Sequence, residues 1–301
     1  MSATRLFITS FSCKVIRRNE DTSEDCLHLN VWTPCTEETR PGCRKTVLVF
    51  FHGQEFQWGD NNYYDGQWLA GLGQVVVVAP NFRLGAFGFL HIGCPGNVSE
   101  SNIEGVACAP GNVALDDQRL AVEWIVAHIR SFGGNSTDIV LLGSGSGAWS
   151  VGAHMLGATA RGPSDQFWKH ERFTKVILMS ESPLRRRLPA RSQALSLRLG
   201  CPPEDLAEQL KCLRNKPARA ILEQTNQAKD FLFPSLVPTS AEADNVSGTP
   251  KGGDLAEDVA NWLNTRYGIA VSHHVIEAYR TASVALDGGI LLLSVYYLLL
   301  R

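Results

Sequence analysis

Residues 141–148 read Leu-Leu-Gly-Ser-Gly-Ser-Gly-Ala, and the rest of the chain can be interpreted from this segment. The apolar run at 139–142 is typical of a buried strand, and the glycines after it predict a sharp turn into a helix. Gly143 and Gly147 fall where small residues let a strand and a helix pass closely. This layout is typical of a nucleophile elbow, whose central residue is a serine. The central residue here is Gly145.

Other short motifs follow in a fixed order between residues 23 and 226: SEDCLHLNV at 23–31, NFRLG at 81–85, GFL at 88–90, Gly111-Asn112, Asp117-Gln118, Trp124 and FGG at 132–134. Together with the elbow they resemble the type-B carboxylesterase and cholinesterase family. This ordered set is far more specific than a single five-residue motif. The resemblance implies an α/β-hydrolase fold, with a wound, mostly parallel sheet and helices on both faces, truncated here at both ends.

Within this family, the glycine at the centre of the elbow resembles the neuroligins, adhesion proteins that carry glycine in place of the nucleophile. The resemblance implies a non-catalytic protein that binds an extracellular protein partner. Alternatives are a serine ester hydrolase represented by an incomplete sequence, a small-molecule binder without turnover, and a fragment that does not fold stably. A missing segment explains an absent histidine but not Gly145, which argues against the hydrolase.

The segment that would form an oxyanion hole also departs from the family. Residues 52–56 read His-Gly-Gln-Glu-Phe, where the family has His-Gly-Gly-Gly-Phe with two glycines that lend backbone N–H groups. Gln54 and Glu55 are therefore degenerate oxyanion-hole positions, and the N–H of Ser146 would be the third donor. We expect side chains at 54 and 55 to disturb the backbone, and an ionised Glu55 to oppose a developing negative charge. We favour the interpretation that the sequence of this loop drifted after selection for catalysis was lost. A new ligand contact through Glu55 is the alternative.

The remaining catalytic groups are not found either. The resemblance implies that the histidine base lies further downstream than this sequence extends. Ser144 and Ser146 are expected to point into the neighbouring packing rather than to act as surrogate nucleophiles. Six of the eight histidines are interpreted as packed or solvated residues rather than as a base: His28, His52, His128, His154 and His273-His274. No residue is therefore assigned a catalytic role, and we expect no ester hydrolysis.

Eight cysteines fall into close pairs and favour an oxidising, extracellular compartment. The predicted disulfides are Cys13–Cys26, Cys35–Cys43, Cys94–Cys108 and Cys201–Cys212. The first and last follow from the family resemblance, and the middle two from proximity alone. Asn-x-Ser/Thr acceptors for glycosylation occur at Asn97, Asn135 and Asn245. Residues 1–14 lack the apolar core of a signal peptide, so we expect the true start of the protein to be absent.

Composition excludes several classes of function. The 301 residues are 44% hydrophobic, which is typical of a globular protein. Their formal net charge of −2 gives no support to binding of nucleic acid. No cysteine or histidine spacing indicates a metal site, and no cofactor is expected. The apolar stretch at 288–300 falls short of the ~20 residues of a spanning helix, so a strand or core helix is favoured over a membrane anchor.

The chain is expected to divide at residue 228, into a hydrolase-like core at 1–228 and a divergent segment at 229–301. Uninterrupted apolar runs predict strands at 47–51, 75–78, 139–142 and 176–179, and residues 30–34 read as extended. Helical periodicity predicts helices at 116–130, 148–156, 192–199, 204–213 and 218–225. Strands alternating with helices indicate an α/β fold.

Overall fold

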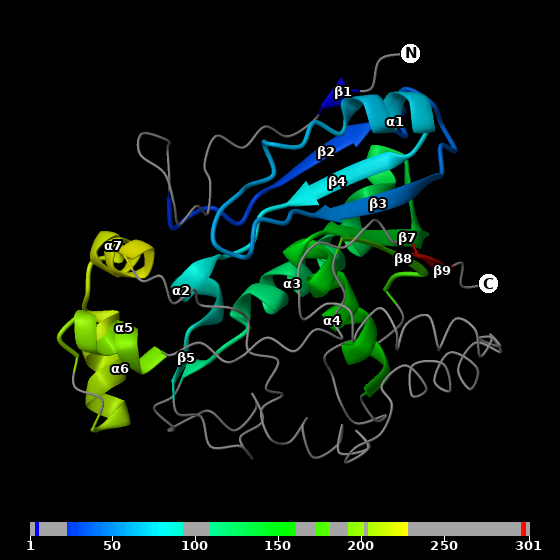
Figure 1. Ribbon diagram of the computed structural model, residues 1–301. Helices are drawn as coiled ribbons and strands as arrows, with labels where there is room; N and C mark the ends of the chain where they lie inside the picture. Colours follow the sequence, from blue (N-terminus) through cyan, green and yellow to red (C-terminus); the bar gives the residue numbers. More distant parts are fainter. Residues whose placement is uncertain are drawn as a thin grey trace.

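The computed structural model describes residues 4–5, 23–92, 109–160, 172–180, 192–201, 204–227 and 296–298. Its main strands are β1 (Thr4–Arg5), β2 (Leu29–Thr33), β3 (Lys45–Phe51), β4 (Val76–Pro80), β7 (Gly134–Ser144), β8 (Lys175–Met179) and β9 (Tyr296–Leu298). They form one sheet in the order β1-β2-β4-β3-β7-β8-β9 (Figure 1). The β4–β3, β3–β7 and β7–β8 pairs are parallel, and the β1–β2, β2–β4 and β8–β9 pairs are antiparallel.

The described helices are α1 (Gln67–Gly73), α2 (Gly85–Phe89), α3 (Val113–His128), α4 (Ser146–Ala160), α5 (Ser192–Arg198), α6 (Leu206–Arg214) and α7 (Ala218–Gln227). A 3₁₀ turn, η2 (Ile129–Phe132), extends α3, and a short pair, β5 (His91–Ile92) with β6 (Ala109–Pro110), lies apart from the sheet. The strands predicted at 30–34, 47–51, 75–78, 139–142 and 176–179 are confirmed, as are all five predicted helices. The α/β class is therefore confirmed.

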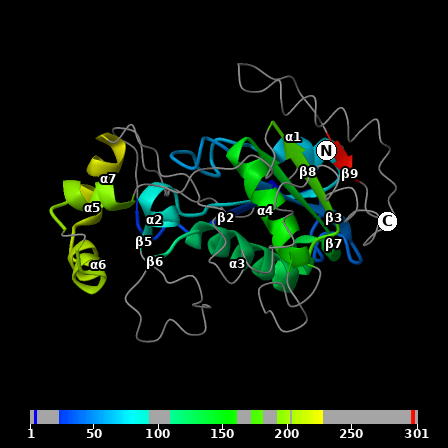
Figure 2. The same ribbon diagram turned by 60° about the horizontal axis from the view of Figure 1, so that its bottom comes forward.

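The two faces of the sheet pack against different helices, as alternate residues of β4 show. Val76 and Val78 belong to the main core, which includes Val122 of α3 and Val151 of α4. Val77 and Ala79 pack on the opposite side in a smaller cluster with Ala70 of α1. Right-handed crossovers between parallel strands require this division, because the chain passes from β3 to β4 in one direction and from β4 to β7 in the other. Figure 2 shows α3 and α4 together beside the sheet.

A second, smaller core lies at one end of the molecule, where α5, α6 and α7 gather beyond α2 (Figure 1). Leu195, Leu199, Leu210 and Leu213 are buried there. The predicted Cys201–Cys212 disulfide is formed and joins the turn after α5 to α6. Amphipathic helices of this length depend on such packing, because isolated short helices are marginal in water.

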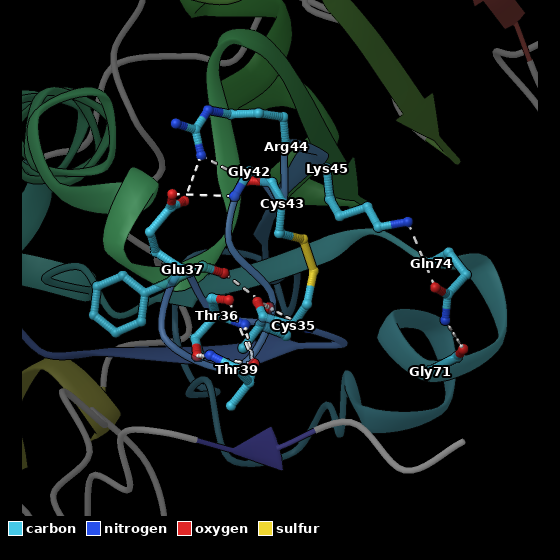
Figure 3. Close-up of a disulfide and its surroundings, with 12 residues drawn as sticks. Cys35, Thr36, Glu37, Thr39, Gly42, Cys43, Arg44, Lys45, Gly71 and Gln74 are labelled. Carbon is cyan, nitrogen blue, oxygen red and sulfur yellow. Dashed lines mark hydrogen bonds and ion pairs between the residues drawn. A yellow bond between two sulfur atoms is a disulfide. The ribbon is translucent and has the colours of Figure 1, made fainter.

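The predicted Cys35–Cys43 disulfide is also formed, and it closes the polar excursion between β2 and β3 (Figure 3). Within this loop the Glu37 carboxylate accepts hydrogen bonds from Arg44, at 2.6 Å, and from the Gly42 N–H. Cys26 is disulfide-bonded. Its expected partner lies outside the described residues, as do the other predicted pair and two of the glycosylation acceptors: Cys13, Cys94, Cys108, Asn97 and Asn245.

Little of the segment at 229–301 is described. Its strand β9 pairs with β8, so residues 296–298 of the apolar stretch at 288–300 form a strand, one of the two forms favoured over a membrane anchor. Among the described residues, no helix combines the length and apolar character that a membrane span requires. The division at residue 228 stays a prediction.

Candidate functional site

The turn between β7 and α4 has the geometry of an elbow. β7 ends at Ser144, α4 begins at Ser146, and Gly145 between them has a φ of +54°. The Gly145 N–H donates to the Met179 carbonyl at 2.8 Å, and the Gly145 carbonyl accepts from the Trp149 N–H at 3.1 Å. The apex is therefore held between the end of β8 and the first turn of α4.

The glycines on either side of the apex lie where the strand and the helix nearly touch. A Cβ on Gly143 would overlap the carbonyl of Gly147, and a Cβ on Gly147 would overlap the carbonyl of Phe51 at the end of β3. Backbone atoms cannot move aside as a flexible side chain can. Only glycine fits at either position without displacing the helix from the sheet.

The apex itself is open. A Cβ on Gly145 would meet no heavy atom within 4 Å, in contrast to both neighbouring glycines. Glycine adopts a φ of +54° without steric penalty, whereas an L side chain is strained there. The backbone thus presents an unobstructed position at the apex that carries no hydroxyl group.

The loop after β3 lies directly beside the elbow, because Phe51 and Gly143 are register partners in parallel strands. Three successive residues of this loop have positive φ: Gln54 at 83°, Glu55 at 57° and Phe56 at 60°. Left-handed backbone costs about 1–2 kcal/mol per residue for side chains other than glycine. The side chains at 54 and 55 have thus not moved the backbone out of the region that glycine favours, and the loop carries the strain.

Two contacts join this loop to the elbow. The Phe56 N–H donates a hydrogen bond of 3.2 Å to the Oγ of Ser146, which is fully buried. A Cβ on Gly53 would lie 2.5 Å from the Ser144 carbonyl oxygen, so the two backbones are nearly in contact. The Phe56 ring is buried against Phe89 and, edge to face, against Trp149. Ser146 is therefore a packing residue in the structure, as expected, whereas Glu55 is exposed.

His52 opens the loop and is buried beneath it. Its Nδ1 donates to the Gly53 carbonyl at 3.0 Å, and its ring stacks on Phe82 with centroids 4.5 Å apart. Burial lowers the pKa of His52 to about 4, although the Gly53 hydrogen bond and Asp60 oppose the shift. The residue is therefore neutral at physiological pH and supports the loop, as the sequence predicted.

His154 on α4 belongs to a buried polar chain that crosses to α3. Its Nε2 donates to the Gln118 side-chain oxygen at 2.9 Å, and the Gln118 amide donates to the Ser150 hydroxyl at 3.1 Å. Burial lowers the pKa of His154 to about 3, and the charge of Arg119 lowers it further. This histidine is packed, as expected. His28 is instead part-exposed beside Asp25, and His128 is exposed.

The motif at 81–85 positions α3 through a contact that sequence reasoning did not assign. Asp117 is almost fully buried, and its carboxylate accepts from the Arg83 Nη2 and Nε at 2.7 and 2.8 Å and from the Arg83 backbone N–H at 3.0 Å. Asp117 raises the pKa of the Arg83 guanidinium. The pair fixes the turn after β4 to the start of α3. Both residues belong to motifs quoted in the sequence analysis. The sequence thus marked each of them, but not that the two form an ion pair.

The structure brings together the elbow and the loop of residues 52–56. Ser144 is half-buried beside the apex. Within the described ranges, no group of three or more His, Cys, Asp or Glu side chains is arranged to hold a metal ion. His273 and His274 lie outside the described residues.

Comparison with known proteins identifies the family. The carboxylesterase family profile matches residues 7–258. A cholinesterase of Mus musculus is 38% identical over 226 residues, which cover 72% of this chain and 33% of that protein. An acetylcholinesterase of Electrophorus electricus is 39% identical over 215 residues, which cover 68% of this chain and 30% of that protein.

The chain therefore belongs to the type-B carboxylesterase and cholinesterase family, and its fold is the α/β-hydrolase fold. The aligned part of the chain spans about a third of the length of these relatives.

Proposed function

We propose that this chain is a non-catalytic member of the carboxylesterase family that acts by binding another extracellular protein. Gly145 carries the proposal. It stands at the apex of the β7–α4 turn with a φ of +54° and has no hydroxyl group to attack an ester. Acyl transfer by this fold requires a nucleophile at that position, because the strained turn exposes its oxygen to the base.

The surroundings of the apex support the same interpretation. Ser146 is buried and accepts the Phe56 N–H, so its hydroxyl is committed to the loop. His52 and His154 are buried, with lowered pKa values and hydrogen bonds to other groups. A general base needs a pKa near the working pH and reach to the nucleophile. Ser146 is therefore not suited to replace the missing hydroxyl, and His52 and His154 are not suited to act as its base.

A location outside the cell is part of the proposal. The disulfides Cys35–Cys43 and Cys201–Cys212 are formed, and disulfides persist mainly in oxidising compartments. The adhesion role follows the likeness of the elbow to the neuroligins, and the partner is proposed only as a protein outside the cell. A fold does not define a function by itself, so the role needs a direct test.

The test compares covalent labelling by a fluorophosphonate probe, and turnover of an acyl ester, in the secreted chain and in a Gly145→Ser variant. We expect no labelling and no turnover of the unmodified chain. Labelling of the variant alone would mean that a base survives in this chain and that loss of the nucleophile was a single step. Labelling of the unmodified chain would overturn the proposal and direct attention to Ser144, the half-buried hydroxyl beside the apex.

A small ligand at the apex is the second candidate, and one observation favours it. A Cβ at Gly145 would meet no atom of the described residues within 4 Å, so they leave open the space that a nucleophile's side chain would occupy. A fluorescent acyl-ester analogue that cannot be hydrolysed should then bind the unmodified chain. A Gly145→Leu variant, which fills that space, should weaken binding at least tenfold, with unchanged circular dichroism as the control. Equal binding by both proteins would exclude this site.

A further inference from the structure

The first part of β7 departs from the sheet. Gly134 pairs with Lys45 of β3, and Ile139 pairs with Val47, so the residues 135–138 stand opposite Thr46 alone. Extra residues of this kind form a bulge that is left out of the ladder of backbone hydrogen bonds. The bulge reads Asn-Ser-Thr-Asp, and its first three residues form an acceptor for N-linked oligosaccharide.

We propose that Asn135 carries an N-linked oligosaccharide, attached on this bulge at the end of β7 remote from the elbow. The inference rests on the extracellular location in the proposed function, because the donor and the transferase are found in the secretory pathway. It does not depend on whether the chain is catalytic. Of the three acceptors in the sequence, Asn135 is the one that lies among the described residues.

The local geometry leaves the reacting atom available. The Asn135 side-chain oxygen accepts from the Thr137 N–H at 3.1 Å and from the Thr137 hydroxyl at 2.9 Å. An N–H can only donate, so the amide oxygen must face Thr137 and the amide nitrogen must face away. That nitrogen makes no hydrogen bond to any described residue. Thr137 itself is exposed, which places this turn at the surface.

The end of the bulge is firmly anchored. Asp138 accepts from Lys175 of β8 at 2.6 Å and from the Thr46 hydroxyl at 2.7 Å. These contacts hold the pKa of the Asp138 carboxyl below its usual range, with the Lys175 hydrogen bond as the largest cause. A sugar added at Asn135, which is half-buried, would therefore extend from a turn whose last residue is fixed to β3 and β8.

The donor in this reaction is a lipid-diphosphate-linked oligosaccharide, which supplies both the sugar and the leaving group. The Asn135 amide nitrogen attacks the anomeric carbon of the first sugar, and a carbon–nitrogen bond forms. The bond from that carbon to the diphosphate oxygen breaks, and the lipid diphosphate leaves with the electron pair. The amide nitrogen loses one proton, and nothing is oxidised or reduced.

The position of the sugar also has a consequence for binding. Asn135 and Ser144 lie near opposite ends of β7. Gly133, just before the bulge, lies against the Cys35–Cys43 disulfide, because a Cβ there would overlap the Cys35 carbonyl. An oligosaccharide at Asn135 would therefore shield the disulfide end of the sheet and not the elbow end.

The experiment expresses the full chain behind a supplied signal peptide in secreting cells, with Asn97→Gln and Asn245→Gln so that Asn135 is the one acceptor left. A reporter acceptor added after Arg301 identifies the molecules that have entered the secretory pathway. Among these we expect most Asn135 peptides to carry an oligosaccharide that peptide-N-glycosidase removes. Thr137→Ser should retain the modification, and Thr137→Ala should abolish it.

Occupancy is measured by peptide mass spectrometry in both the cell lysate and the medium, so poor folding does not hide the result. Molecules with a modified reporter and an unmodified Asn135 would overturn the proposal. The supplied signal peptide imposes the route, so this failure would say nothing against the binding function.

Discussion

The backbone N–H of Phe56 donates a hydrogen bond of 3.2 Å to the Oγ of Ser146, across 90 residues of sequence. The bond joins the strained loop after β3 to the first residue of α4, immediately after the apex Gly145. Both partners are fully buried. The hydroxyl at 146 therefore has a structural role, and the degenerate loop and the degenerate elbow are held together as one unit.

Ser146→Ala should lower the free energy of unfolding by about 1–3 kcal/mol, because it removes the buried hydroxyl that accepts from the Phe56 N–H. Urea unfolding followed by tryptophan fluorescence measures the change. Ser144→Ala is the matched control, since Ser144 is half-buried and its hydroxyl makes no hydrogen bond to a described residue; we expect a change within about 0.5 kcal/mol. Equal losses in the two variants would show that the bond to Phe56 is not what stabilises this region.

Replacing a residue of the strained loop with glycine should increase the stability of the protein, whereas glycine usually lowers it. Gln54→Gly and Glu55→Gly each remove about 1–2 kcal/mol of left-handed strain. Glycine also makes the unfolded chain more flexible, which offsets about 0.4–1 kcal/mol of that gain. We expect each variant to raise the free energy of unfolding by up to about 1.6 kcal/mol, as the net of these two terms.

Glu38→Gly is the control for this comparison, because Glu38 is exposed and does not have a positive φ. It gains no relief of strain and should be destabilised by the flexibility of glycine alone. The melting temperatures of the three variants check the ranking. A loss of stability in Gln54→Gly and Glu55→Gly as large as that in Glu38→Gly would contradict the strain assigned to the loop.

The three glycines of the elbow should rank sharply when each is replaced by alanine. Gly145→Ala meets no heavy atom and should lose only the cost of positive φ, about 1–2 kcal/mol. Gly143→Ala and Gly147→Ala place a Cβ on backbone carbonyls and should lose more than about 4 kcal/mol or fail to fold. Soluble yield and urea midpoints measure the ranking. A Gly145→Ala protein as damaged as the other two would mean that the apex is not open.

The sequence predicted the central strands because burial on both faces leaves uninterrupted apolar runs, as at Val76, Val77 and Val78 of β4. The elbow was predicted for a similar reason, since close backbone contact at Gly143 requires glycine. The short helix α1 (Gln67–Gly73) was missed, because seven residues give too few turns for a periodic pattern.

The connections within the site could not be predicted in the same way. Ser146 is buried and accepts a hydrogen bond from a distant loop. The sequence alone does not distinguish such a serine from an exposed one. The chain from His154 through Gln118 to Ser150 also joins residues with no common periodicity. Such pairs depend on where two helices meet, which sequence spacing alone does not give.

The buried histidines predict how stability depends on pH. Burial lowers the pKa of His52 to about 4 and of His154 to about 3, whereas an unfolded histidine titrates near 6.5. Between about pH 6.5 and 4 the unfolded chain therefore binds protons that the folded chain does not. Stability rises with pH wherever the unfolded state binds more protons, so these residues contribute stability above pH 6.5 that is lost as the pH falls through this window.

His154→Gln isolates one of these protons. We expect the variant to lose stability at pH 7.5, because the hydrogen bond to Gln118 is disturbed, but to depend less steeply on pH between 6.5 and 4. Urea unfolding at half-unit steps of pH measures the slope, which should fall by about one proton in the variant. His128→Gln is the control for the loss of a histidine at an exposed position. Parallel slopes for the original chain and His154→Gln would mean that His154 accepts its proton in the folded state as readily as in the unfolded one.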